Sequence, residues 1–425
     1  MKKLLYISYL FPPVGGSGVQ RSLKFVKYLP EYGWESIVLT ANHRFLNQPK
    51  DFSLSLELPN NQVIYNSFAP DLRWLFKLLW GLRLHKIVSF LQRCILIPDP
   101  EIIWLPFAKL TLKRIFDEHK IDFVLITSPP YAPLFLGEYV KKRYGVDYCI
   151  DFRDPWTSGV GRLYNTPPAW IGKIEKKWEK RIISQAKSIV CVNEAMVEEL
   201  HKDYPEIPDT KLHSVNNGYD EEDFRDNVSS ETNGNKLRLV YTGAFYDLRQ
   251  PDIVWQAISE LVTDGRIDKN KISIEVFGKN NPLFVLGSFQ NNSLIKAIVQ
   301  TKQYVSHSKS VHEILKADLL LLFSGSGSSE RMNSPAKLYE YMRSAKPIFA
   351  IIDPLGIAAK ILAPAETCVI ADSSSVEAIK TAFSLLYEKW ENGNLAYSPN
   401  WDYIKSFERH KLTAKLANLL AISRV

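Results

Sequence analysis

Two short glycine-containing segments come soon after apolar runs that are typical of buried strands. Glycine allows a sharp backbone turn and a close approach to a ligand, and the amides at the start of a following helix attract anions. Both segments therefore predict contact with an anionic group, and a tight strand–helix turn is the simpler alternative. The residues are Gly15, Gly16, Ser17 and Gly18 after the run 4–10, and Gly243 after the run 237–241.

Charged residues accompany the second glycine segment. Arg249 follows that glycine by six residues, and a guanidinium near a strand–helix turn can hold a phosphate through two hydrogen bonds. Lys337 and Glu340 are three residues apart, so they share one face of a predicted helix over 335–344. Ser334 is expected to cap the start of this helix. These residues predict a phosphate-binding edge. A solvated arginine and a surface ion pair are the alternatives.

A third block, DFRDPW at residues 151–156, follows another predicted strand. Ligands bind beyond the carboxyl ends of the strands in parallel sheets, and this block lies at such an end. Its acidic side chains would there bind or orient the hydroxyl groups of a ligand. A structural pair of Asp151 with Arg153 is the alternative. We take Asp154 as the better candidate for a catalytic residue.

Several other chemistries find no support in the sequence. Gly16 and Gly18 are followed by Arg21 where a dinucleotide fingerprint needs its third glycine, and no acidic residue ends the second predicted strand. There is no Asp-x-Asp, and the eight histidines show no metal-binding spacing with acidic partners. The four cysteines form no Cys-x-x-Cys pair. We therefore expect no cofactor and no metal ion.

The segment 71–98 combines aromatic, apolar and basic residues. Its tryptophans and phenylalanines alternate with arginines and lysines at helical spacing. Such a helix would dock on an anionic membrane surface. A helix packed inside the N-terminal domain, with its arginines reaching outward, is the alternative.

The elements that must position these residues alternate between short apolar runs and helical patterns. This alternation predicts an α/β protein with two doubly wound parallel sheets. We expect an N-terminal domain over 1–215, a polar linker over 216–235 and a second domain over 236–400. A last helix over 401–425 is expected to pack back on the first domain. The predicted strands are 4–10, 36–40, 63–65, 123–127, 148–152, 188–192, 237–241, 272–277, 319–323, 347–351 and 367–370.

Length and composition fit such a two-domain protein. The chain has 425 residues, of which 46% are hydrophobic and 23% charged, and this excludes a disordered or low-complexity protein. The net charge of +7 is too dispersed for a nucleic-acid-binding protein. The apolar run near the N-terminus is broken by Tyr6 and Ser8 and lacks a cleavage site, so it predicts a strand and not a signal peptide. We expect a cytoplasmic location, with peripheral contact at the inner face of the cell membrane.

Eight blocks of the sequence, in order, resemble the retaining glycosyltransferases of family four, which have the GT-B fold and use nucleotide sugars. The similarity spans nearly the whole chain. The blocks include ISYLFPPVGGSGVQRSLKFVKYLPEYGW from Ile7, ITSPPYAPLFLG from Ile126, DFRDPW from Asp151, NNGYDEEDF from Asn216, YTGAFYDLR from Tyr241 and SPAKLYEYMRSAKPIFAI from Ser334.

The resemblance implies roles for individual residues. The loop 15–18 and Gly243 would lie against the donor, and Arg249 stands where the family has a lysine that grips the diphosphate. Lys337 would add a second positive charge there. Glu340 matches the second glutamate of the Glu-x7-Glu motif, whose carboxylate binds the donor ribose.

Three positions depart from the family pattern. Met332 replaces the first glutamate of the motif, and Ala244 replaces an arginine. Ser128 stands where several relatives have a histidine that contacts the sugar, so we take it as a second candidate catalytic residue. These departures are similar to a branch of the family that assembles polysaccharides, and they leave the identity of the sugar open.

The resemblance implies transfer of a hexose, with retention, from a nucleoside-diphosphate sugar to a saccharide or a lipid-linked saccharide in cell-surface polysaccharide synthesis. Met332 and Ala244 favour an alternative, a non-catalytic protein of the same fold that binds a nucleotide or a lipid. Arg249, Lys337 and Glu340 argue against it, because a scaffold does not need a complete grip on a diphosphate. A sugar-nucleotide 2-epimerase is a further alternative, but its acidic and histidine residues are not found.

Overall fold

The structure of the protein, a computed structural model, describes residues 1–159, 166–225, 235–245, 251–278, 281–325, 327 and 330–423. It divides into two compact units. Unit 1 comprises Met1–Asn216 together with Arg409–Val425, and unit 2 comprises Asn217–Glu408. Residues 226–234 of the predicted linker lie outside the described residues.

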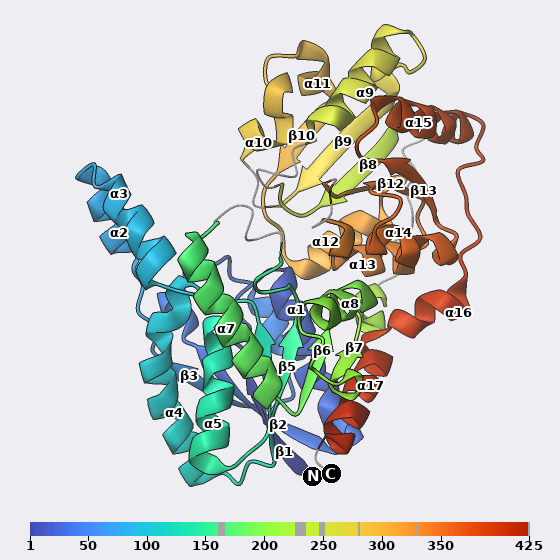
Figure 1. The fold of residues 1–425 in the computed structure, drawn as a ribbon. Helices are drawn as coiled ribbons and strands as arrows, with labels where there is room; N and C mark the ends of the chain where they lie inside the picture. The colour runs from blue at the N-terminus through green and yellow to red at the C-terminus, as the bar shows by residue number, and fades with distance from the viewer. Residues whose placement is uncertain are drawn as a thin grey trace. The chain divides into compact units, whose positions relative to one another are not determined.

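Within the described part of unit 1, seven strands form one parallel sheet in the order β3-β2-β1-β4-β5-β6-β7 (Figure 1). The order reverses direction between β1 and β4, as in other doubly wound sheets. The bounds are β1 (Lys2–Ile7), β2 (Trp34–Ala41), β3 (Val63–Ser67), β4 (Phe123–Ser128), β5 (Tyr148–Phe152), β6 (Ser188–Cys191) and β7 (Leu212–Ser214).

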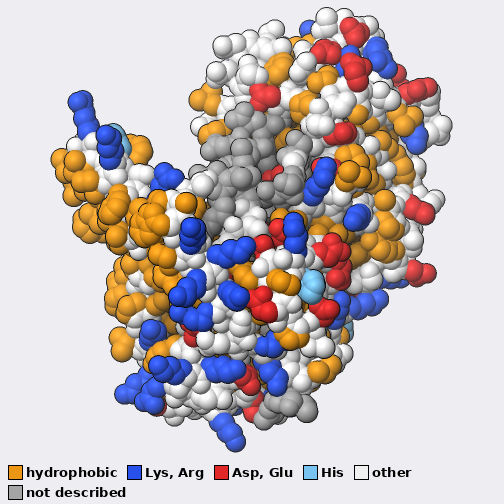
Figure 2. All heavy atoms as spheres, viewed as in Figure 1, with side chains coloured by type: hydrophobic (Ala, Val, Ile, Leu, Met, Phe, Trp, Pro, Cys, Tyr) orange, Lys and Arg blue, Asp and Glu red, His pale blue; other side chains and the backbone are white. Residues whose placement is uncertain are grey.

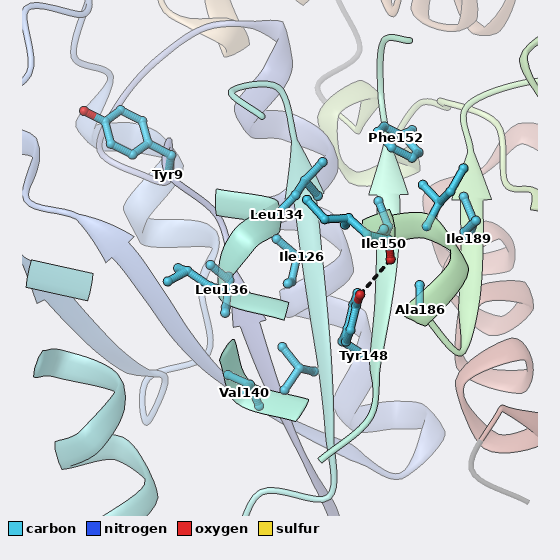
Figure 3. Packing of buried hydrophobic residues seen from close by; sticks show 14 of the residues in the cluster. Tyr9, Ile126, Leu134, Leu136, Val140, Tyr148, Ile150, Phe152, Ala186 and Ile189 are labelled. Atoms are coloured by element: carbon cyan, nitrogen blue, oxygen red, sulfur yellow. Dashed lines mark hydrogen bonds between the residues drawn. The ribbon is translucent and has the colours of Figure 1, made fainter. Parts of the chain in front are cut away.

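Helices cover both faces of this sheet, which is why its strands read as continuous apolar runs. In β1, Leu5 and Ile7 pack with one set of helices, whereas Leu4 and Tyr6 pack with the other. Figure 3 shows part of the first layer, where the Tyr148 hydroxyl donates a hydrogen bond of 2.7 Å to the carbonyl of Ile182. The first set is α4 (Leu105–Glu118), α5 (Phe135–Tyr144), α7 (Ala169–Gln185) and α8 (Glu194–Asp203), and the second is α1 (Ser17–Tyr28) and α17 (Arg409–Ile422).

The segment 71–98 forms two short helices, so the prediction of one helix is wrong. These are α2 (Arg73–Gly81) and α3 (His85–Phe90), which continues into a wider turn over Leu91–Ile95. Arg83 between them has a φ of 59°, and a helix cannot continue through this left-handed conformation. No side chain of α2 is buried, so this helix is not the internal element of the alternative reading.

Unit 2 holds a second parallel sheet, whose six described strands follow the order β10-β9-β8-β11-β12-β13. Together the two sheets confirm the predicted class, an α/β protein with two doubly wound parallel sheets. The bounds are β8 (Leu237–Thr242), β9 (Ile272–Phe277), β10 (Val299–Lys302), β11 (Leu319–Phe323), β12 (Ile348–Ile352) and β13 (Cys368–Asp372).

The helices of unit 2 again form two layers. Trp255 of α9 and Phe383 of α15 belong to one buried cluster, and Tyr341 of α13 belongs to the cluster on the other face of the sheet. The first layer holds α9 (Asp252–Thr263), α10 (Pro282–Leu286), α11 (Ser293–Ile298) and α15 (Val376–Glu391). The second holds α12 (His307–Leu315), α13 (Lys337–Ser344), α14 (Ile357–Leu362) and α16 (Trp401–Ile404).

Candidate functional site

The first glycine segment lies between β1 and α1 of unit 1. Gly16 directly precedes α1 and has a φ of 112°, a conformation that strains any residue with a Cβ atom. Glycine has no side chain that could cap the helix. The backbone amides in the first turn of α1 therefore find no hydrogen-bond acceptor in the side chain of residue 16. Ser17 is the first residue of α1, and Gly15 donates its amide to the carbonyl of Pro49 at 2.8 Å.

Arg153 holds three loops together at this edge of the sheet. Its guanidinium donates to the carbonyls of Gly18, Ser128 and Pro129, which follow β1 and β4, while Arg153 itself follows β5. A Cβ atom on Gly18 would lie 2.4 Å from the Arg153 Nη1 atom, so a larger residue there would displace the guanidinium group. Burial lowers the pKa of Arg153. Gly18 and Arg153 therefore shape this edge of the sheet.

Asp151 is buried and pairs with Arg21 of α1, not with Arg153. The Arg21 Nη2 atom lies 2.7 Å from the Asp151 Oδ1 atom, and Thr127 donates its hydroxyl to Oδ2 at 2.8 Å. The ion pair between Asp151 and Arg21 thus connects β5 to α1. Of the two predicted catalytic residues, Asp154 is exposed just beyond β5, and Ser128 is fully buried at the end of β4.

A carboxyl group that the sequence interpretation missed lies near these loops. Asp99 accepts hydrogen bonds from the amides of Tyr131 at 2.5 Å and Ala132 at 3.1 Å. Burial, and then the neighbouring carboxylate of Glu101, raise the pKa of Asp99 to about 8. The sequence gives only a weak signal for it, the acidic residues of Asp99-Pro100-Glu101 between apolar runs.

In unit 2, Lys337 lies against the second glycine segment. Its Nζ atom is 3.6 Å from the centre of the Tyr241 ring, which is a cation–π contact. Gly243 has a φ of 136°, and a Cβ atom there would lie 2.4 Å from the same Nζ atom. The turn after β8 thus uses glycine to admit the ammonium group. The structure brings together Gly243 and Lys337, which are 94 positions apart by subtraction of their numbers.

Helix α13 is fastened to the end of β8 by Tyr341, whose hydroxyl accepts a hydrogen bond of 2.9 Å from the amide of Thr242. One residue earlier, Glu340 places its Oε1 atom 2.9 Å from the Nε2 atom of His307. Asp223 lies on the other side of this histidine, with its Oδ2 atom 3.9 Å from Nδ1. His307 was also missed from the sequence, and it orients the carboxylate that the resemblance assigns to the ribose.

The start of α13 differs from the prediction. The helix begins at Lys337 and not at Pro335, and Ala336 in the capping position provides no side-chain hydrogen bond. Ser334 is buried in the loop before it, so its predicted role as the helix cap is wrong. Met332, at the position of the absent first glutamate, ends a short turn that begins with Glu330. The Glu330 carboxylate is buried and accepts a hydrogen bond of 2.8 Å from the Ser324 hydroxyl.

The unit 2 arrangement offers a cation and, one helical turn further along, a carboxylate. Such a pair can bind a phosphate group through Lys337 and sugar hydroxyl groups through Glu340. Arg249, the other predicted phosphate ligand, lies outside the described residues.

Comparisons with known proteins match part of the chain to a sequence family and nearly the whole chain to a known fold. Residues 16–223 match the sequence family described as Glycosyltransferase Family 4. No curated protein sequence matches the chain.

Solved structures match over almost the full length of the chain. A sucrose-phosphate synthase from Thermosynechococcus elongatus matches with a TM-score of 0.69 at 11% identity, covering 99% of each chain. A glycosyltransferase from Rickettsia africae matches with a TM-score of 0.62 at 14% identity, covering 99% of this chain and 98% of that one. A lipopolysaccharide outer core galactosyltransferase matches with a TM-score of 0.59 at 11% identity, covering 99% of each chain. Together these structures show that the chain has the GT-B fold.

Proposed function

We propose that this protein transfers a hexose from a nucleoside-diphosphate sugar to a saccharide or lipid-linked saccharide, with retention of configuration, in the synthesis of a cell-surface polysaccharide. The observation that carries the proposal is the position of Lys337 in unit 2. Its ammonium group lies against the glycine turn after β8, and Glu340 follows on the same helix. A cation such as Lys337 can bind the diphosphate of the donor, and a carboxylate such as Glu340 can accept hydrogen bonds from the ribose hydroxyl groups.

The proposed reaction breaks the bond between the sugar C1 and the phosphate oxygen and forms a bond between C1 and the acceptor oxygen. The acceptor proton passes to the departing phosphate oxygen, and a nucleoside diphosphate is released. Lys337 and Arg249 would stabilise the charge that develops on this leaving group. Under this proposal no metal ion is required. Asp154 would orient the acceptor from unit 1, and a lipid-linked acceptor would place the enzyme at the inner face of the membrane.

Binding measurements on Lys337→Ala test the donor site. Loss of a charge-assisted contact costs about 1.5–3 kcal/mol, which is roughly a 10- to 150-fold loss of affinity. We expect a loss of this size for nucleoside diphosphates in calorimetric titrations and a much smaller one for the bare nucleosides. Lys316→Ala, which removes an exposed lysine after α12, is the control. Equal affinities of the parent and Lys337→Ala for every diphosphate would refute the site.

A second variant separates the two ends of the nucleotide. Glu340→Gln should lower the binding affinity for nucleosides and for nucleoside diphosphates by similar factors, since both contain the ribose. Release of free nucleoside diphosphate from candidate donor sugars then distinguishes turnover from binding alone. Turnover that persists with a chelator such as EDTA is expected, and its complete loss would contradict the metal-independent reaction. Binding without release under any condition would favour the non-catalytic alternative.

A further inference from the structure

Helices α2 and α3 and the turn after them form an arm that extends from the sheet of unit 1 (Figure 1). We call residues 73–95 the helical hairpin. Large apolar side chains cover its surface, and Figure 2 shows them as a continuous patch with basic groups at the tip. Trp74 is 65% exposed, Trp80 is 59% exposed and Phe90 is 56% exposed. Leu78, Leu82, Ile87 and Ile95 are also exposed. A patch of this kind usually marks an interaction surface.

The charge of the hairpin has a single sign. Between Asp71 and Asp99 the sequence holds no acidic residue, and it holds five arginines and lysines. The five basic residues are Arg73, Lys77, Arg83, Lys86 and Arg93. A surface that is at once apolar and purely cationic is complementary to a partner with an apolar interior and an anionic surface.

In the second half of the hairpin, the apolar residues and the basic residues lie on different faces. Ile87, Phe90 and Cys94 recur at intervals of three and four residues, so they share one face of the helical segment. Lys86, Ser89 and Arg93 share another face in the same way. This arrangement would let apolar side chains enter a lipid layer while the cations stay at the level of the headgroups.

The base of the hairpin is held firmly. Arg73 donates to Asp71, with an ion-pair distance of 2.5 Å, and Arg93 donates to the carbonyl of Thr166. Val88 is 3% exposed and Leu96 is 9% exposed, so these two side chains are buried in the folded chain. The exposed apolar side chains therefore belong to a built element of unit 1.

We propose that the helical hairpin docks unit 1 on an anionic lipid bilayer by lying in the interface. Helix α2 has nine residues and is roughly 13 Å long, whereas the hydrocarbon core is about 30 Å thick. Among the described residues, no helix has the length and apolar character to cross a membrane. Shallow insertion of Trp74, Trp80 and Phe90 removes their apolar surface from water. This docking does not depend on the reaction proposed above, although a lipid-linked acceptor would make it useful.

Flotation with vesicles tests the proposal. The parent protein should float with vesicles that contain phosphatidylglycerol and bind far less to pure phosphatidylcholine vesicles. Replacing Lys77, Arg83 and Lys86 by glutamine should weaken partitioning to the anionic vesicles by roughly 100-fold. Replacing Trp74, Trp80 and Phe90 by serine should weaken it by at least roughly 100-fold. These side chains are exposed, so the fold of unit 1 should persist in both variants.

Two controls match these changes elsewhere on unit 1. Lys113, Lys142 and Lys173 are exposed, and their replacement by glutamine removes the same net charge. Phe52, Leu56 and Leu110 are exposed apolar residues for replacement by serine. Both controls should bind vesicles like the parent. A parent that never floats, or hairpin variants that float like the controls, would overturn the proposal and point to a protein partner. Nucleoside diphosphate affinity should stay constant throughout, which separates this result from a failure of the donor site.

Discussion

Gly243 leaves room for the Lys337 ammonium group at the end of β8. A Cβ atom at this position would lie 2.4 Å from Nζ, and the backbone φ is 136°. The Gly243→Ala variant should therefore displace the ammonium group. We expect its affinity for a nucleoside diphosphate to fall by at least roughly tenfold, as when a charge-assisted contact is lost. Calorimetric titration measures this change.

Gly265 provides the matched control for this prediction. It has a φ of 71°, but no atom lies within 4 Å of the position of its Cβ. Gly265→Ala should carry a backbone strain of about 1–2 kcal/mol and keep the parent affinity. If Gly243→Ala and Gly265→Ala bound the nucleoside diphosphate with the same affinity, the role of Gly243 in making room for the Lys337 ammonium group would be wrong.

Residues in short local patterns could be predicted as candidates from the sequence. Gly243 follows the end of a predicted strand, and Lys337 and Glu340 lie in the first turns of a predicted helix. His307 could not be predicted, because 33 residues separate it from Glu340 and only the folding of unit 2 brings the two side chains together. Asp99 is similar, since its partner amides lie more than 30 residues away.

At the scale of elements, the Arg21–Asp151 ion pair joins α1 to β5. Both side chains are buried, at 1% and 0% exposure. Removing one partner leaves the other charge buried without compensation, so Asp151→Asn or Arg21→Met should each destabilise unit 1 by about 3–5 kcal/mol. The double variant Arg21→Met with Asp151→Asn should lose less than the two single losses added together. Urea unfolding measures the free energies, and additive losses would contradict the coupling.

Asp99 links the segment after the helical hairpin to the turn that precedes α5, and it makes stability depend on pH. Its pKa of about 8 in the folded protein lies above the ordinary value near 4. Between these values the unfolded chain releases the proton and the folded protein keeps it, so stability falls as pH rises from about 4 to 8. Asp99→Asn removes the ionisation and can still accept a hydrogen bond. The variant should gain stability over the parent as pH rises through this window.

Thermal unfolding midpoints at pH 5, 6.5 and 8.5 check the prediction. Asp117→Asn changes an exposed position on α4 and is the control. Its unfolding midpoint should not rise relative to that of the parent as pH increases. If the difference in unfolding midpoint between Asp99→Asn and the parent stayed constant with pH, the raised pKa of Asp99 would be contradicted.

Three predicted strands, at residues 148–152, 272–277 and 319–323, have the observed bounds. Residues 148–152 and 319–323 are buried on both faces, whereas strand 272–277 also contains half-buried side chains. Strands β7 and β10 were missed. Each lies at an edge of its sheet and has three or four residues, so neither needs a continuous apolar run. The break between α2 and α3 was missed because Arg83 is not a residue that predicts a left-handed turn.

For the molecule as a whole, unit 1 is completed by the end of the chain. Leu416 of α17 is fully buried in the cluster that holds Phe25 and Val26 of α1. Leu416→Ala should therefore destabilise unit 1 by about 2–5 kcal/mol. Hydrogen exchange should show faster exchange in peptides of unit 1, including its first strands, and unchanged exchange in unit 2.

Ile422→Ala changes an exposed residue on the same helix, with 72% exposure, and should alter stability by less than about 0.5 kcal/mol. If Leu416→Ala instead loosened unit 2 first, α17 would belong to a different cooperative unit from the one assigned here.

The class of fold could be predicted from the alternation of strands and helices, since parallel strands need crossover helices on both faces. Figure 1 shows the same doubly wound plan in each unit. The exposure of the helical hairpin could not be predicted, because an apolar and basic helical pattern fits a packed helix as well as a protruding one.

The division of the chain also has a consequence for protein engineering. Unit 2 is encoded by one uninterrupted stretch, Asn217–Glu408, whereas unit 1 is assembled from the two flanking stretches. Unit 2 can therefore be exchanged as one segment with only two junctions. Under the proposed function, replacing it by the corresponding stretch of a protein with the same fold would change the choice of sugar donor and leave unit 1 intact.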